Sequence, residues 1–170
     1  MNPDEIARVP MVPLRSVLFV ASTEPAQIAD ALASGADAVI IDMEEPQTPM
    51  NESVRERARG IVRDVLSASP PAGTPGSPRI MCRLQAPRTG QMLKDLRAVL
   101  HPSLHGVVVP KSFGPDDIVA ADALLTNAEV EADLPAGRVV LYPILETAPA
   151  LRRAYDIAMA SPRVAHLGGA

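Results

Sequence analysis

Short apolar runs, each rich in Val, Ile or Leu, recur along the chain with polar segments between them. They cover residues 14–20, 38–41, 79–84, 106–109, 139–145 and 164–167. Within each run the apolar residues are nearly continuous and do not alternate with polar ones, which is typical of strands buried on both faces. The pattern predicts six strands in a sheet that other elements cover.

The segments between these runs carry apolar residues at helical spacing. The clearest stripe places Val54, Ala58, Ile61, Val62, Val65 and Leu66 at i, i+4, i+7, i+8, i+11 and i+12. Residues 151–159 repeat the same period of about 3.6, and weaker stripes cover residues 25–34 and 91–100. A further helix runs from Pro115, suited to a first helical turn, to about Asn127. Strict alternation of strands and helices predicts parallel strands joined by helical crossovers.

The length of the chain narrows the choice of α/β fold. The 170 residues can bury a substantial core, but a closed (β/α)8 barrel needs roughly 250. We predict an α/β fold, a TIM barrel truncated after about six strands, because the last run ends on Gly168-Gly169-Ala170. Residues 1–170 would form a single incomplete domain, with residues 1–13 as an N-terminal extension and residues 69–78 as a Pro/Gly-rich surface loop. An open flavodoxin-type sheet is the alternative, with a different strand order.

Composition excludes several classes of partner. With 16 Lys and Arg against 20 Asp and Glu, the net charge of −4 argues against nucleic-acid binding and against polybasic membrane docking. No apolar stretch approaches the ~20 residues of a spanning helix, and the first residues lack the apolar region of a signal peptide. We expect a soluble cytoplasmic protein. Cys82, the single cysteine, has no partner for an internal disulfide.

Ionisable residues follow four successive apolar runs. Asp42 and Glu44 follow the second run, and Arg83 lies near the end of the third. Lys111 follows the fourth run and Glu146 the fifth. The carboxyl ends of parallel strands form one ligand-binding face, so these groups should meet there. A cluster of mixed sign suits an anionic substrate held by cations, with carboxylates free to bind a divalent metal or to move a proton.

Each of these residues also has a purely structural interpretation. Glu146 precedes Thr147, a plausible N-cap, and could simply favour the start of a helix. Lys111 could be a solvated loop lysine. An arginine in a buried strand must be paired or bind an anion, so Arg83 could form an internal salt bridge to Asp42.

Familiar catalytic motifs do not occur in the sequence. His101, His105 and His166 share no ligand-like spacing, and there is no HExxH. No GxGxxG follows the first run and no GxSxG occurs, which disfavours a dinucleotide site and a serine hydrolase.

Five short motifs, in order and with compatible spacing, resemble the HpcH/HpaI aldolase and citrate lyase β-subunit family. They are Arg15-Ser16-Val17-Leu18-Phe19-Val20, Ala36-Asp37-Ala38-Val39-Ile40-Ile41-Asp42-Met43-Glu44, Val109-Pro110-Lys111, Ile144-Leu145-Glu146-Thr147-Ala148 and Ser161-Pro162-Arg163-Val164. Two positions depart from the usual pattern of the citrate lyase-like branch. Glu45 stands where that branch has aspartate, and Gln85 stands where it often has asparagine.

The resemblance implies a (β/α)8 barrel that binds Mg²⁺, or Mn²⁺ in its place, and cleaves or forms a carbon–carbon bond through an enolate. Implied substrates are 2-oxo acids, or CoA thioesters such as citryl-, malyl- or citramalyl-CoA. Glu146 would be a metal ligand, and Arg83 would hold the substrate's carboxylate or carbonyl oxygen. Asp42 and Glu44 would organise Arg83 and the metal's waters. Further substrate contacts at the rim would come from Arg15 and Lys111.

The resemblance also places a second metal carboxylate beyond the last residue of this chain. A second hypothesis is therefore a non-catalytic remnant that serves as a binding or assembly subunit, and we expect weak or no activity from the 170 residues alone. Open edges at the first and last strands predict self-association, and we expect a homo-oligomer.

Overall fold

Six parallel strands form one sheet in the order of the sequence, β1-β2-β3-β4-β5-β6, curled into a half-barrel. The computed structural model describes residues 12–44 and 51–169. The strands are β1 (Val17–Ala21), β2 (Ala38–Asp42), β3 (Arg79–Arg83), β4 (Leu104–Val109), β5 (Val140–Leu145) and β6 (Gly168–Gly169). Sequential order confirms the predicted partial TIM barrel and excludes the flavodoxin-type alternative.

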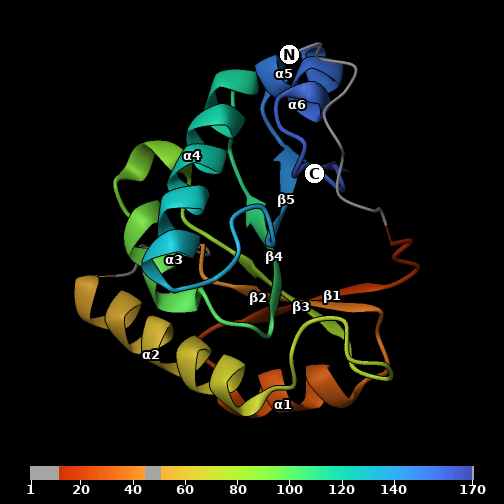
Figure 1. Ribbon diagram of the computed structural model, residues 1–170, viewed down its shortest axis with the longest axis vertical. Coiled ribbons are helices and arrows are strands. Elements are labelled where there is room, and N and C mark those ends of the chain that lie inside the picture. Colours follow the sequence, from red (N-terminus) through yellow and green to blue (C-terminus); the bar gives the residue numbers. More distant parts are fainter. Residues whose placement is uncertain (1–11, 45–50, 170) are drawn as a thin grey trace.

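Helices cover one side of this sheet (Figure 1). They are α1 (Pro25–Ala33), α2 (Glu52–Ala68), α3 (Met92–Val99), α4 (Pro115–Glu131), α5 (Ala148–Arg152) and α6 (Ala154–Met159), with a short 3₁₀ turn, η2 (Pro87–Thr89). Asn51 caps α2 by accepting a hydrogen bond from the Val54 N–H, and prolines begin α1 and α4. Among the described residues, no helix combines the length and the apolar character that crossing a membrane requires.

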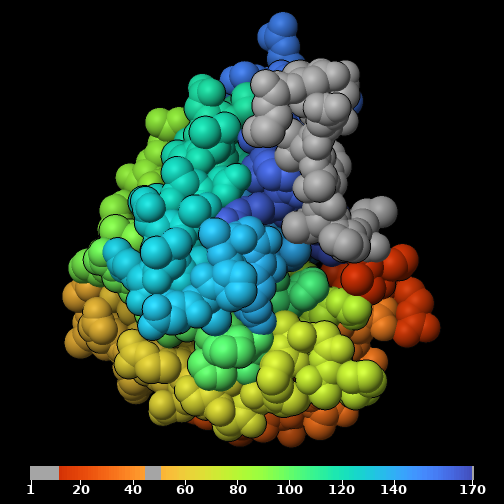
Figure 2. Space-filling view, viewed as in Figure 1, coloured from red at the N-terminus to blue at the C-terminus, as the bar shows by residue number. Residues whose placement is uncertain are grey.

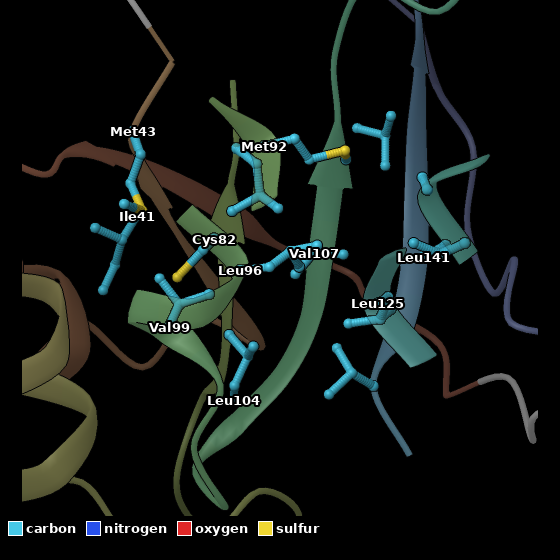
Figure 3. Close-up of a cluster of buried hydrophobic side chains, with 14 of the residues drawn as sticks. Ile41, Met43, Cys82, Met92, Leu96, Val99, Leu104, Val107, Leu125 and Leu141 are labelled. Carbon is cyan, nitrogen blue, oxygen red and sulfur yellow. The ribbon is translucent and has the colours of Figure 1, made fainter. Parts of the chain in front are cut away.

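The main core lies between the helices and the sheet. Figure 3 shows Ile41, Cys82, Val107 and Leu141, from four successive strands, together with side chains of α3 and α4 such as Leu96. A smaller cluster occupies the opposite face of the sheet and contains Ala38, Ile40, Met81, Val108 and Ile144. Successive residues of a strand point to opposite faces. Asp42 follows Ile40 and Arg83 follows Met81 at this spacing of two, so both belong to the inner face, the face without helices.

The last strand differs from the prediction. The apolar run at residues 164–167 was expected to continue through Gly168 and Gly169 as one strand, but Val164 makes only an isolated bridge to Leu141, and the paired strand is only Gly168–Gly169 against Ile144 and Leu145. The two pairing points are three positions apart on β5 and four positions apart on the other segment. The extra residue interrupts the ladder in the manner of a β-bulge.

Other boundaries differ less. The expected helix over residues 151–159 is divided into α5 and α6, because Arg153 takes a non-helical backbone conformation. β4 starts two residues early, at Leu104, with a register shift opposite Ile80 and Met81. Residues 69–78 contain only bends and turns, as expected, and lie beside α2 in yellow-green (Figure 2). Most of the expected extension, residues 1–11, falls outside the described residues.

Candidate active site at the carboxyl ends of the strands

The centre of the site is a two-pronged ion pair between β2 and β3. Asp42 and Arg83 are the last residues of their strands and lie directly opposite each other in the register. Arg83 Nε donates to Asp42 Oδ1 at 2.7 Å and Arg83 Nη2 donates to Oδ2 at 2.6 Å. These bonds raise the pKa of the guanidinium, against the opposing effect of its burial. The internal salt bridge considered from the sequence is therefore present.

Glu44 extends this pair into a chain of charges. Its Oε2 lies 3.2 Å from Arg83 Nη1, and its Oε1 lies 2.8 Å from Lys111 Nζ. The second contact is an ion pair without hydrogen-bond geometry, since Oε1 is a buried oxygen that accepts no hydrogen bond from the described residues. The Glu44 side chain is only 6% exposed, whereas that of Lys111 is 55% exposed. A buried carboxylate thus rests between two cations, one of which reaches solvent.

Lys111 connects this chain to Glu146 through its backbone. Its φ of +51° lies in the left-handed region, which few residues other than glycine adopt. In this conformation its N–H donates to Glu146 Oε1 at 2.7 Å. Non-glycine residues in such conformations cluster at functional sites. One residue therefore holds both carboxylates, Glu44 by its ammonium and Glu146 by its amide.

The loop after β5 is fixed by the neighbouring threonine. The hydroxyl of Thr147 donates to the Ser112 carbonyl at 2.7 Å and accepts from the Ala150 N–H at 3.2 Å. The N-cap considered from the sequence is therefore present. Glu146 itself faces Lys111, and only its Oε1 has a hydrogen-bond partner among the described residues.

The structure does not bring Arg15 to this cluster. Arg15 precedes β1 and binds Asp37, the residue before β2, with Nε and Nη2 at 3.1 and 2.7 Å from its carboxylate oxygens. Both residues lie at the amino ends of their strands, opposite the cluster. The expectation that Arg15 contacts substrate at the rim is not met by its position.

Three residues at the site were missed in the sequence. Ser22 follows β1 and Ser112 follows Lys111, and both are buried with a hydroxyl oxygen that has no hydrogen-bond partner among the described residues. Their positions one and three residues after strands β1 and β4 were the available signal. The Phe19 ring lies under Arg83, with the guanidinium carbon 5.2 Å from the ring centre. Alternation along β1 would have placed Phe19 on the inner face, but its contact with Arg83 depends on the curl of the sheet.

The donor set fits Mg²⁺ only in part. Mg²⁺ prefers oxygen ligands, keeps several waters and is often bound through one or two carboxylates. Within the described part of the chain, one carboxylate oxygen of Glu146 has no hydrogen-bond partner, and the buried side-chain oxygens of Ser22, Glu44 and Ser112 include one each without a hydrogen bond. However, no group of three His, Cys, Asp or Glu residues suited to a metal occurs in residues 12–44 and 51–169. The described residues therefore offer one carboxylate ligand and not a complete cage.

The fold and the site together define a protein of the TIM-barrel type, with its ionic groups at the end of the sheet where such barrels bind ligands. The chain belongs to the HpcH/HpaI aldolase/citrate lyase family, which matches residues 15–168. It is 26% identical over 150 residues to the citrate lyase β subunit of Leuconostoc mesenteroides subsp. cremoris, a match that covers 88% of this chain and 47% of that protein.

Solved structures show the same fold. The Mycobacterium tuberculosis CitE protein in complex with magnesium, acetoacetate and coenzyme A is 24% identical with a TM-score of 0.62, over 96% of this chain and 48% of that one. A citrate lyase from Burkholderia xenovorans LB400 is 19% identical with a TM-score of 0.69, over 100% of this chain and 51% of that one. The chain thus spans about half the length of these relatives.

Proposed function

We propose that this chain carries part of the active site of a Mg²⁺-dependent carbon–carbon lyase that acts on a 2-oxo acid or an acyl-CoA thioester through an enolate. The observation that supports it best is the continuous array Asp42–Arg83–Glu44–Lys111–Glu146 at the carboxyl ends of four strands. Citrate lyase β subunits are among the relatives, and one was solved with oxaloacetate and magnesium.

The cationic and the anionic residues of the array have different roles in the proposed reaction. Arg83 presents a planar cation that matches a carboxylate or a developing oxyanion, and the exposed ammonium of Lys111 adds a second positive charge beside it. Asp42 and Glu44 hold Arg83 in place. Glu146 would hold the cation through its carboxylate, with Mn²⁺ as a substitute. When bound, Mg²⁺ supplies Lewis-acid stabilisation of the enolate charge.

Calorimetric titration tests this proposal with Mg²⁺ and oxaloacetate or pyruvate as the ligands. Wild-type protein should bind oxaloacetate only when Mg²⁺ is present. Glu146→Gln retains an oxygen that accepts from Lys111 but loses the charge, and should weaken binding at least tenfold. Glu131→Gln is the matched control, because Glu131 is an exposed residue that pairs with Arg97 on the helical side. Mg²⁺-independent binding, or equal affinity in both variants, would refute the assignment.

A non-catalytic binding or assembly subunit is the second candidate. One observation favours it: the described residues contain no three-ligand metal cluster. It predicts organic-acid binding without turnover. A cleavage assay that compares this chain with a version extended by two further strand–helix units distinguishes the two candidates. We expect weak or no turnover from the 170 residues, and turnover in the extended protein only if the enzyme proposal is correct.

Self-association is part of the proposal. β1 and β6 are the edge strands of the described sheet, and unpaired strand edges are templates for pairing with another chain. We expect a homo-oligomer, which sedimentation velocity at several concentrations would detect.

A further inference from the structure

The ionic array is supported from behind by a buried polar network. Gln85 follows β3 by two residues, is 4% exposed and donates from Nε2 to the Met43 carbonyl at 2.6 Å. Met43 is also held by β3, because its N–H donates to the Arg83 carbonyl at 2.9 Å. Met43 lies between Asp42 and Glu44. The backbone between the two carboxylates is thus hydrogen-bonded through both the N–H and the carbonyl of Met43.

Gln85 is itself fixed by charged residues of two helices. Its backbone N–H donates to Asp95 Oδ2 at 3.0 Å, and Asp95 Oδ1 accepts from Arg59 Nε at 2.8 Å. Asp95 belongs to α3 and Arg59 to α2, and each is 2% exposed. Arg59 Nη2 donates to Gln91 Oε1 at 2.7 Å. Buried charges are retained only where they are paired and hydrogen-bonded, and this pair meets that condition.

The apolar packing leaves the Met43 segment little freedom. The Met43 side chain is 4% exposed and belongs to the main core, where Figure 3 shows it beside Ile41. A substitution at Gln85 therefore acts on the backbone of Met43 while the Met43 side chain stays packed in the core. We expect its effect to be a change in the orientation of the Asp42 and Glu44 carboxylates.

We propose that Gln85 is a positioning residue, held by Asp95, that fixes the Asp42–Glu44 turn so that both carboxylates meet Arg83. The chemical purpose of this positioning rests on the proposed function, since the aligned guanidinium is the group that would hold the substrate. The contacts of Gln85 with Met43 and Asp95 do not depend on that function. Loss of the amide donor leaves the Met43 carbonyl buried without its bond and lets the turn move away from Arg83.

The test follows the Arg83 Nε–H proton by NMR, because this proton is hydrogen-bonded to Asp42. In Gln85→Glu, which has the same shape but no amide donor, we expect its exchange with solvent to rise at least tenfold. The Arg97 Nε–H, which donates to Glu131 at 2.8 Å, serves as an internal reference and should change less than twofold. Gln91→Ala is the matched control, because it removes a hydrogen bond to Arg59 but does not touch Met43.

A merely structural role for Gln85 predicts a different pattern. General destabilisation would also accelerate exchange of the Arg163 Nε–H, which donates to Asp122 at 2.6 Å in a separate buried network. Unchanged Arg83 exchange, or equal acceleration at Arg83 and Arg163, would overturn the inference. If Gln85→Glu does not fold, Gln85→Met is measured in its place, with the same expected selectivity.

Ligand titration separates this inference from the proposed function. Where wild-type protein binds oxaloacetate with Mg²⁺, Gln85→Glu should weaken that binding at least fivefold while Gln91→Ala leaves it unchanged. If wild-type protein binds no oxaloacetate, the proposed function fails, and selective exchange at Arg83 still decides whether Gln85 positions the turn.

Discussion

Replacing Arg83 by methionine should destabilise the protein strongly at neutral pH. Methionine keeps the length and the apolar part of the side chain but leaves Asp42 and Glu44 without their shared cation. Arg83 makes two hydrogen bonds to Asp42 and an ion pair to Glu44. In the variant, two neighbouring carboxylates of like charge remain in a partly closed site.

The structure sets the size of this loss. Hydrogen bonds to charged groups contribute about 1.5–3 kcal/mol each, and breaking a fully buried ion pair costs about 3–5 kcal/mol. The pair is not fully buried, since the side chains of Arg83 and Asp42 are 22% and 18% exposed, and Lys111 still neutralises Glu44. After this discount for solvent, we expect a loss of about 3 kcal/mol in the free energy of unfolding at pH 7.

Urea denaturation followed by circular dichroism measures this loss at pH 7. Arg97→Met is the control, because the Arg97–Glu131 pair is more than half exposed on both sides and should contribute little to stability. A loss below about 1 kcal/mol at pH 7, or a loss no larger than that of Arg97→Met, would show that the ionic array does not hold the strand ends together.

Three further predictions concern the supporting fold. Burial, together with neighbouring cations, lowers the pKa of His105 from 6.5 to about 4. The folded state therefore resists protonation of His105, and the stability that is present above pH 6.5 is lost as the pH falls toward 4. His105→Gln should recover about 2 kcal/mol of this lost stability, measured by acid denaturation curves. Gly106→Ala should cost about 2–3 kcal/mol in urea, since a Cβ would lie 2.6 Å from Val140 Cγ2, whereas Gly60→Ala, with open space in α2, should not destabilise. Burial raises the pKa of the Cys82 thiol, so a thiol reagent should label it only after unfolding, and rapid labelling of the native protein would contradict the packing.

The alternation of strands and helices was predictable because it depends on local periodicity. Each predicted strand overlaps the observed one, and the convergence of Asp42, Arg83 and Glu146 followed from the rule that parallel strands share a carboxyl end. The same rule could have placed Arg15 correctly, because a residue that precedes its strand belongs at the amino end. The interruption of the last strand could not be predicted for a different reason. Its pairing depends on an extra residue between two contacts with β5, which no apolar pattern encodes.

The contacts that hold the site residues in place could not be predicted from the sequence. The amide of Lys111 reaches Glu146 only because its backbone takes a left-handed conformation, and nothing in Val109-Pro110-Lys111 specifies that. The contact between Gln85 and Met43 joins two different strand–helix units. Interactions of this kind arise from how units pack, and periodicity within a unit carries no information about them.

Donor arithmetic at Arg83 explains how one side chain can both hold the site together and remain available to a ligand. A guanidinium has five N–H groups. Two of them reach Asp42 and one faces Glu44, which leaves one hydrogen on each terminal nitrogen. Glu146 likewise has one carboxylate oxygen that accepts from Lys111 and one that accepts no hydrogen bond from the described residues. The inner face of the sheet therefore presents groups whose directions are already fixed before anything binds. An anion that meets the remaining Arg83 N–H groups therefore requires little reorganisation of the site, which is the condition for effective electrostatic stabilisation of a developing negative charge.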